Sequence, residues 1–178
     1  MNPALIARLL DALVGKALVS NAFRGTLVEA MLAGALAPSW KWIADGWGSF
    51  DFEGPGGIGL EVKQSAARQD WHDHTSAPHR GRFDIAARTG RWEGAKWIVA
   101  PGRAAAIYIF AWHPVFDPAL ADHRDEQQWQ FYALESSRLP EQRSIGLSAI
   151  QALADPCGID AIGEVVGKVL VTHLSESS

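Results

Sequence analysis

The sequence lacks features that define several large protein classes. It contains a single cysteine, Cys157, so no disulfide can form within the chain and no site with several thiolate ligands can be built. A lone cysteine fits the reducing cytosol, and we therefore expect a cytoplasmic protein. The P-loop pattern G-x-x-x-x-G-K-[ST] and the nucleophile-elbow pattern G-x-S-x-G are both absent, so neither of these two chemistries has support.

Long apolar runs are also missing. A membrane helix needs about 18–20 uninterrupted apolar residues, and no segment approaches that length. The N-terminal stretch MNPALIARLLDALVGKAL comes nearest, but Asp11 and Lys16 interrupt it, and no cleavage site of small residues follows a basic start. We expect an amphipathic helix there and no membrane partner.

Positive charge is in short supply. The chain holds 16 Lys and Arg against 20 Asp and Glu, a net charge of −4, whereas a sequence-independent DNA binder usually carries a basic surface. Between residues 79 and 103, however, basic residues clearly outnumber acidic ones. Such a patch can bind phosphates on an acidic protein, and the alternative is an ordinary solvated surface. The basic residues of this segment are Arg80, Arg82, Arg88, Arg91, Lys96 and Arg103.

The sequence does contain the periodicities of a mixed fold. Helical spacing of apolar residues opens and closes the chain, and short strand-like segments lie between. We therefore predict one α/β domain of the α+β kind over residues 1–178, with a mixed sheet flanked by helices. AAIYIFAW is apolar on both faces and should lie inside the sheet. The expected helices are residues 5–18, 25–36, 144–154 and 159–170, and the expected strands are residues 40–52, 58–66, 83–88, 97–100, 105–112 and 129–135.

One predicted hairpin carries the residues with the clearest chemistry. Asp51 precedes a GPGG turn at residues 54–57, and Glu61-Val62-Lys63 follows it. Strand side chains alternate between faces, so Glu61 and Lys63 share one face. A four-residue loop with regular pairing would place Asp51 opposite Leu60, on the other face. A bulge or a loop of odd length near the glycines is therefore required to bring Asp51 to the pair.

Two carboxylates and a lysine suit metal-assisted phosphate chemistry. Asp51 and Glu61 offer the hard oxygen ligands that Mg²⁺ or Mn²⁺ prefers beside water and substrate phosphate. Lys63 could orient the attacking water and stabilise the negative charge that develops. The alternative is a cross-strand ion pair on a solvated sheet face, since E-x-K triplets are common.

The surrounding stretch DFEGPGGIGLEVKQSAARQDW resembles the PD-(D/E)xK nuclease superfamily, and more closely a bacterial group with the E-V-K-Q/S-S-A pattern. The likeness extends through FDIAAR, IYIFAWH and WQFYAL, and it covers about residues 25–155. The superfamily's proline before the aspartate is absent, and Phe50 stands there. The matching residues are Asp51, Gly56-Gly57, Glu61-Val62-Lys63, Gln64-Ser65-Ala66, Gln69 and Trp71.

The resemblance implies a restriction-endonuclease-like fold and Mg²⁺- or Mn²⁺-dependent hydrolysis of phosphodiesters, with DNA as the expected substrate. It also implies that an acid on the N-terminal helix joins the site, for which Glu29 is the candidate, and that Gln64 contacts phosphate. The alternatives are a helix-surface carboxylate and a plain strand-end residue. Arg80, Arg82, Arg88 and Arg91 would bind the nucleic-acid backbone. Asp45 and Glu53 are other acids near Asp51.

Histidines and tryptophans offer further candidates. The segment WHDHTSAPHR could supply a zinc site from His72, His74 and His79, or it could be an ordinary polar loop. Three of the eight tryptophans lie in predicted strands and should be core residues, whereas four flank the proposed site and could contact a ligand. The first set is Trp97, Trp112 and Trp129, and the second is Trp40, Trp42, Trp47 and Trp71.

Two other functions remain open on the sequence alone. The net negative charge also suits a nuclease-fold module that binds a partner without turnover, or an immunity-like protein whose acidic surface binds a basic protein. The sequence leaves open whether the chain forms a homodimer.

Overall fold

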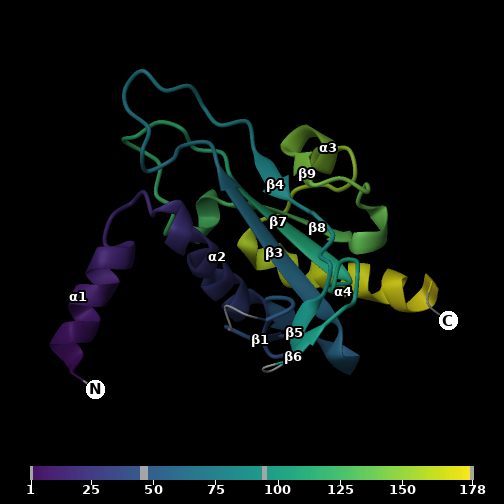
Figure 1. Cartoon of the computed structure of the whole chain (residues 1–178). Coiled ribbons are helices and arrows are strands. Elements are labelled where there is room, and N and C mark those ends of the chain that lie inside the picture. Colours follow the sequence, from purple (N-terminus) through teal and green to yellow (C-terminus); the bar gives the residue numbers. More distant parts are fainter. Residues whose placement is uncertain (1, 45–47, 94–95, 177–178) are drawn as a thin grey trace.

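A five-stranded sheet organises the protein (Figure 1). The computed structural model describes residues 2–44, 48–93 and 96–176, without the side chains of residues 91–93. Its α-helices are α1 (Pro3–Val14), α2 (Asn21–Leu36), α3 (Leu147–Gln151) and α4 (Ile159–Glu176). Its strands are β1 (Lys41–Trp42), β2 (Phe52–Glu53), β3 (Gly59–Ala66), β4 (Arg82–Asp84), β5 (Arg91–Glu93), β6 (Lys96–Ile98), β7 (Ile107–His113), β8 (Gln130–Glu135) and β9 (Ser144–Gly146).

The main sheet is mixed, in the order β1-β2-β3-β7-β8. β3 and β7 run parallel, and the other neighbouring pairs run antiparallel. Every residue of β7 is buried, because strands flank it on both edges and side chains cover both faces. The interior position predicted for residues 105–112 is therefore confirmed.

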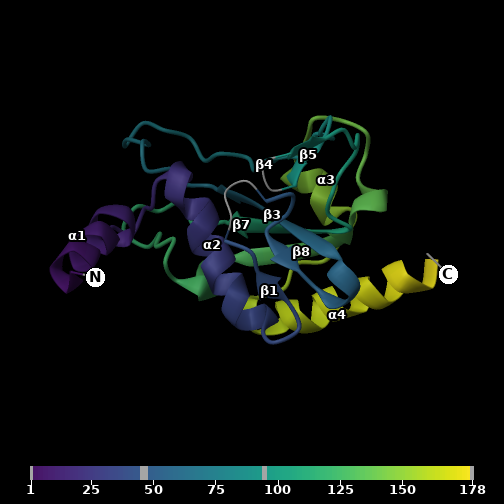
Figure 2. The same cartoon turned by 60° about the horizontal axis from the view of Figure 1, so that its bottom comes forward.

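Helices cover one face of the sheet and a smaller layer covers the other, as Figure 2 shows. Val28 and Leu32 of α2 and Ile162 of α4 pack on one face against Leu60 and other apolar residues of the sheet. On the other face, side chains of β4, β9 and α3 pack against alternate residues of β7 and β8. The predicted mixed α/β architecture, a sheet flanked by helices, is thus confirmed.

Several predicted elements are shorter than expected. Of the strand predicted over residues 40–52, the described residues form only β1 and the first residue of β2, so that prediction is wrong. The strand predicted over residues 83–88 is β4, which ends at Asp84, because the Asp84 carboxylate accepts the Ala86 N–H and turns the chain. Residues 144–154 were predicted as one helix, and they divide into β9 and the short helix α3. Ile145 pairs with Phe83 of β4 in the second core layer, which explains why tertiary packing favours a strand there.

The N-terminal helix also differs from its prediction. α1 ends at Val14 rather than near residue 18. Gly15 caps the helix by donating its N–H to the carbonyl of Asp11. α1 extends away from the sheet in both views, and none of its side chains is buried (Figures 1 and 2). None of the helices in the described ranges combines the length and apolar character that a membrane crossing requires.

Candidate active site

The hairpin register brings Asp51 beside Glu61. Phe52 pairs with Leu60 and Glu53 with Gly59, so residues 54–58 connect the strands. That connection has an odd number of residues, as predicted, and Asp51 follows in line with Glu61 rather than Leu60. The connection depends on glycine, because Gly56 and Gly57 adopt φ angles of 68° and 79° that other residues rarely tolerate.

The Asp51 side chain also hydrogen-bonds to a backbone group at the edge of the sheet. β2 pairs only with the first two residues of β3, so β3 has no ladder partner on that side beyond Leu60 among the described strands. The Val62 N–H donates instead to Oδ2 of Asp51, at 2.7 Å. The Asp51 N–H donates to the Leu60 carbonyl, at 3.0 Å. Backbone and side chain thus fix this carboxylate at the point where the sheet edge opens.

Glu61 and Lys63 form an ion pair on the same edge. Lys63 Nζ donates to Glu61 Oε1, and the two side chains are 22% and 19% exposed. The predicted common face is therefore confirmed. The ion pair is what the alternative interpretation expected, and a role of the two residues in metal chemistry stays a prediction. Because both side chains keep access to solvent, a ligand can reach them without unfolding the strand.

Glu29 approaches the three residues from α2. Its Oε2 accepts a hydrogen bond of 3.0 Å from Nε1 of Trp42 on β1, which restrains the orientation of the carboxylate. One cleft of about 970 Å³, here named the acidic cleft, is lined by Glu29, Asp51, Glu61 and Lys63. The structure therefore brings together four of the residues singled out from the sequence.

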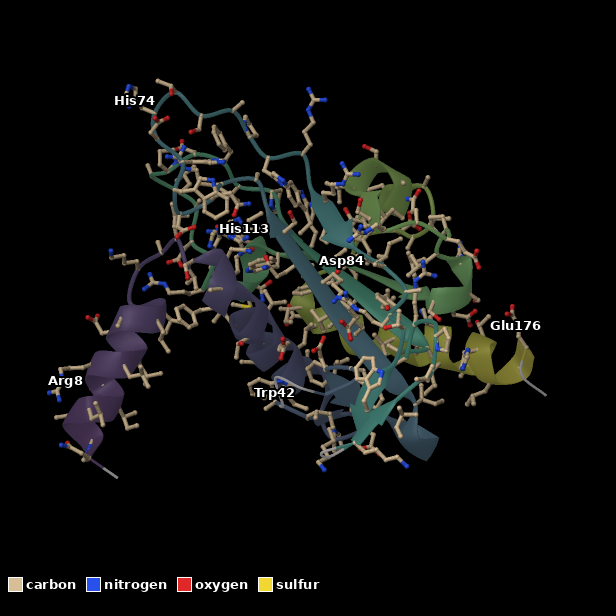
Figure 3. The ribbon with its side chains drawn as sticks, viewed as in Figure 1. Arg8, Trp42, His74, Asp84, His113 and Glu176 are labelled. Carbon is tan, nitrogen blue, oxygen red and sulfur yellow. The ribbon has the colours of Figure 1, made fainter. Side chains whose placement is uncertain are left out.

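Later parts of the chain also line this acidic cleft. Asp84, Arg88 and Trp97 line it, together with Tyr108, which pairs with Glu61 across β3 and β7. Figure 3 labels Trp42 and Asp84, which both belong to the lining. Trp97 is 43% exposed, so its predicted place in the core is wrong: the two-stranded β5-β6 ribbon carries it outside the main sheet.

Burial and neighbouring carboxylates disfavour the ionised form of Asp51. Burial raises the pKa of Asp51 to about 7, and the neighbouring Glu61 and Glu29 carboxylates add to the rise. The Val62 N–H and the Lys63 ammonium oppose it. A further positive charge near Asp51 would therefore stabilise its ionised form. Burial and Glu61 raise the pKa of Tyr108 to about 12, so its hydroxyl stays a neutral donor.

Carboxylates of the acidic cleft fit magnesium better than zinc. Among the described residues, no three His, Cys, Asp or Glu side chains form a group that could hold a metal ion. Mg²⁺ keeps several water ligands and commonly needs only one or two carboxylates, which Asp51 and Glu61 can supply. The donor set of the cleft therefore fits this ion.

The arginines predicted to bind the nucleic-acid backbone do not lie together in one site. Arg88 lines the acidic cleft, where it also forms a 3.0 Å ion pair with Asp84. Arg82 lines a second hollow of about 410 Å³, and Arg80 is exposed and lines neither of these two hollows. The side chain of Arg91 lies outside the described part of the chain. Arg103 lines the cleft, but its guanidinium donates to the carbonyls of Ile85, Leu139 and Pro140.

Gln64 lies outside the acidic cleft. It lines the second hollow, where its Oε1 accepts from Nε of Arg24 at 2.6 Å. Arg24 is the residue that the sequence interpretation missed. It precedes Val28, Leu32 and Leu36 at intervals of four, so the spacing of the buried stripe on α2 pointed to a buried arginine.

The histidine segment forms no metal centre in the described residues. Asp73 uses its Oδ1 to accept bonds from Thr75 and Ser76, and these bonds lower its pKa. Figure 3 shows His74 at the tip of this loop, away from the sheet. His79 instead lines the second hollow.

The tryptophan predictions are confirmed in part. Trp112 and Trp129 are buried core residues, as predicted. Trp42 lines the acidic cleft and Trp71 lines the second hollow, and their contact with a ligand stays a prediction. Trp40 is buried among core residues, so its predicted ligand contact is wrong, and Trp47 and Asp45 lie outside the described residues.

No model of a known protein family matches the chain, and neither a curated protein nor a solved structure matches it. What the site can do therefore follows from its own residues and their geometry.

Proposed function

We propose that this protein is a metal-dependent hydrolase of phosphodiesters in nucleic acid, with DNA as the first substrate to test and a restriction-endonuclease-like arrangement of its sheet. One observation carries the proposal: Asp51, Glu61 and Lys63 line one cleft at an open sheet edge. A surface ion pair alone would need neither the third residue nor the cleft.

Asp51 and Glu61 are the residues that would hold Mg²⁺ or Mn²⁺. Asp51 directly precedes β2 and lies beside Glu61 of β3, which brings two carboxylates together. Burial and the repulsion of Glu61 raise the pKa of Asp51, and a divalent cation would oppose that rise. When bound, the metal neutralises the acids, polarises the scissile phosphate and lowers the pKa of a water ligand.

Lys63 would act on the nucleophile and on the developing charge. Its ion pair with Glu61 fixes the ammonium within the cleft without burying it. From that position it can donate to an attacking water or to a phosphate oxygen, where a fixed positive charge stabilises the transition state more than the ground state.

Glu29 would act as a positioning or proton-accepting acid. The bond from Trp42 restrains one of its oxygens, which leaves the other free to accept from water in the cleft. Arg88 and Trp97, which also line the cleft, would supply a phosphate contact and an exposed ring that can stack on a base.

The test is cleavage of supercoiled plasmid DNA, single-stranded DNA and RNA with Mg²⁺ or Mn²⁺. We expect Glu61→Gln and Lys63→Met each to lower the cleavage rate by a factor of about 100 or more. Glu53→Gln is the matched control, because Glu53 is an exposed acid on the same hairpin that does not line the cleft. DNA binding without cleavage by either metal would identify a binding module instead.

A further inference from the structure

A buried arginine, Arg24, lines the second hollow. Arg24 is 1% exposed, and its guanidinium reaches three amide side chains. Nε donates to Gln64, while Nη2 donates to Asn21 and Gln69, both at 2.9 Å. These acceptors are neutral oxygens, so they satisfy hydrogen bonds without compensating the charge.

No described carboxylate forms an ion pair with Arg24. Its Nη1 is buried and has no hydrogen-bond partner within the described residues. Burial lowers the pKa of this guanidinium to about 10, and Asp70 only partly offsets that effect. Burial destabilises the charge of Arg24, and one of its N–H groups lacks an acceptor. A bound anion would compensate the charge and supply that acceptor.

Other donors face the same hollow from separate elements. Arg82 of β4 and His79 of the preceding loop are exposed and line it. Nδ1 of His79 accepts from the Gly81 N–H at 3.2 Å, so the proton of the neutral ring belongs on Nε2. Among the described residues that line the hollow, Asp84 is the only acid, and Arg24, Lys63 and Arg82 are the arginines and lysine beside it.

We propose that this hollow is a second anion site, which binds a phosphate group of the nucleic-acid strand whose neighbouring phosphate lies in the acidic cleft. Lys63 and Asp84 line both hollows, so one strand can pass from one to the other. Trp71 also lines the second hollow and is 66% exposed, which offers a stacking surface for the adjoining nucleotide.

The identity of the strand rests on the proposed function, whereas phosphate binding at Arg24 does not. Binding of inorganic phosphate to the full chain is therefore measured by calorimetry in EDTA, where the acidic cleft holds no divalent metal. Arg82→Ala is compared with Arg80→Ala, since both remove an exposed arginine of the same segment but only Arg82 lines the second hollow.

We expect wild type to bind phosphate, Arg82→Ala to weaken binding at least fivefold, and Arg80→Ala to change it less than twofold. Arg24→Met should abolish binding and Arg24→Lys should restore part of it. If Arg24→Met does not fold, the comparison of Arg82→Ala with Arg80→Ala decides. No phosphate binding by wild type, or equal losses in the two alanine variants, would overturn the proposal.

Two further arms separate the sources of phosphate and the two proposals. Short DNA strands with and without a terminal phosphate are compared in EDTA, and a preference for the phosphorylated strand assigns the site to strand ends. Equal binding of both strands assigns it to internal phosphates. Glu61→Gln should keep phosphate binding while losing cleavage, so an inactive wild type that still binds phosphate refutes only the nuclease function.

Discussion

The Asp51 carboxylate accepts the Val62 N–H at 2.7 Å, across the gap where β2 no longer pairs with β3. A side chain thus replaces a strand at this position of the ladder. The same carboxylate lies beside Glu61, the other acid that would hold the metal. One residue therefore has a structural and a chemical role, and substitutions can separate them.

Asp51→Asn should separate these roles, because the amide oxygen can still accept from Val62 while the charge is lost. We expect Asp51→Asn to lose Mn²⁺ binding and to unfold at the same urea concentration as wild type at pH 8, or a higher one. Asp51→Ala should lose Mn²⁺ binding and also about 1–2 kcal/mol of stability, since it leaves a buried N–H without its acceptor. Calorimetry and urea titration provide the two measurements, and equal stability of the two variants would contradict the structural role.

The pKa of Asp51 predicts how stability depends on pH. Its value of about 7 in the folded protein is higher than the 3.8 of an unperturbed carboxyl. The protonated form is therefore favoured by folding, so this contribution is complete below about pH 4 and is lost as pH rises through 7. A loss of about 2 kcal/mol is expected after allowance for partial solvent access.

Metal should reverse that loss. Mn²⁺ stabilises the ionised carboxylate, so we expect it to raise the melting temperature more at pH 8 than at pH 5.5. Thermal scans of wild type and Asp51→Asn at both pH values check this. A rise in melting temperature that is independent of pH, or that persists in Asp51→Asn, would show that Mn²⁺ binds elsewhere.

His123 predicts a second pH effect with the opposite sign. Its Nδ1 accepts the Val19 N–H at 3.0 Å, and burial lowers its pKa to about 4. The unfolded chain takes up a proton near pH 6.5, whereas the folded protein does so only near 4, so stability falls as pH drops through this window. We expect a loss of up to about 3 kcal/mol.

Replacing His123 tests that effect. His123→Gln should be less stable than wild type at pH 7 but should lose less additional stability between pH 6.5 and 4, in urea titrations at several pH values. His74→Gln, at an exposed loop position, is the control and should retain the wild-type slope. An unchanged slope in His123→Gln would assign the acid sensitivity to other groups.

The bond from Trp42 to Glu29 predicts a positioning effect on turnover. Trp42→Phe keeps most of the packing but removes the Nε1 donor, so Glu29 should lose its fixed orientation. We expect kcat to fall by about tenfold with little change in KM. Lys41→Ala, at the exposed neighbour on β1, should leave both constants unchanged. A fall in KM alone would contradict positioning of a catalytic acid.

Periodicity predicted the elements of the main sheet well, because burial on both faces leaves a continuous apolar pattern in β7 and alternation in β3. The same alternation predicted that Glu61 and Lys63 share a face, and loop parity predicted how Asp51 would join them. The prediction for Trp97 was wrong because the sequence pattern of a short strand with a tryptophan is the same in a buried sheet and in a separate two-stranded ribbon. Arg24 was missed because a charged residue is ordinarily assigned to the solvent side of a helix.

The unpaired edge of β3 also bears on how the protein avoids self-association. An open edge next to apolar strands is a template for pairing with another chain, and natural proteins protect such edges with charged side chains. Here Asp51 occupies the first free N–H, and Glu61 and Lys63 stand just beyond. The residues proposed for catalysis therefore stand where charged side chains can also protect the edge from pairing with another chain, and we expect simultaneous neutralisation of all three to yield protein that aggregates.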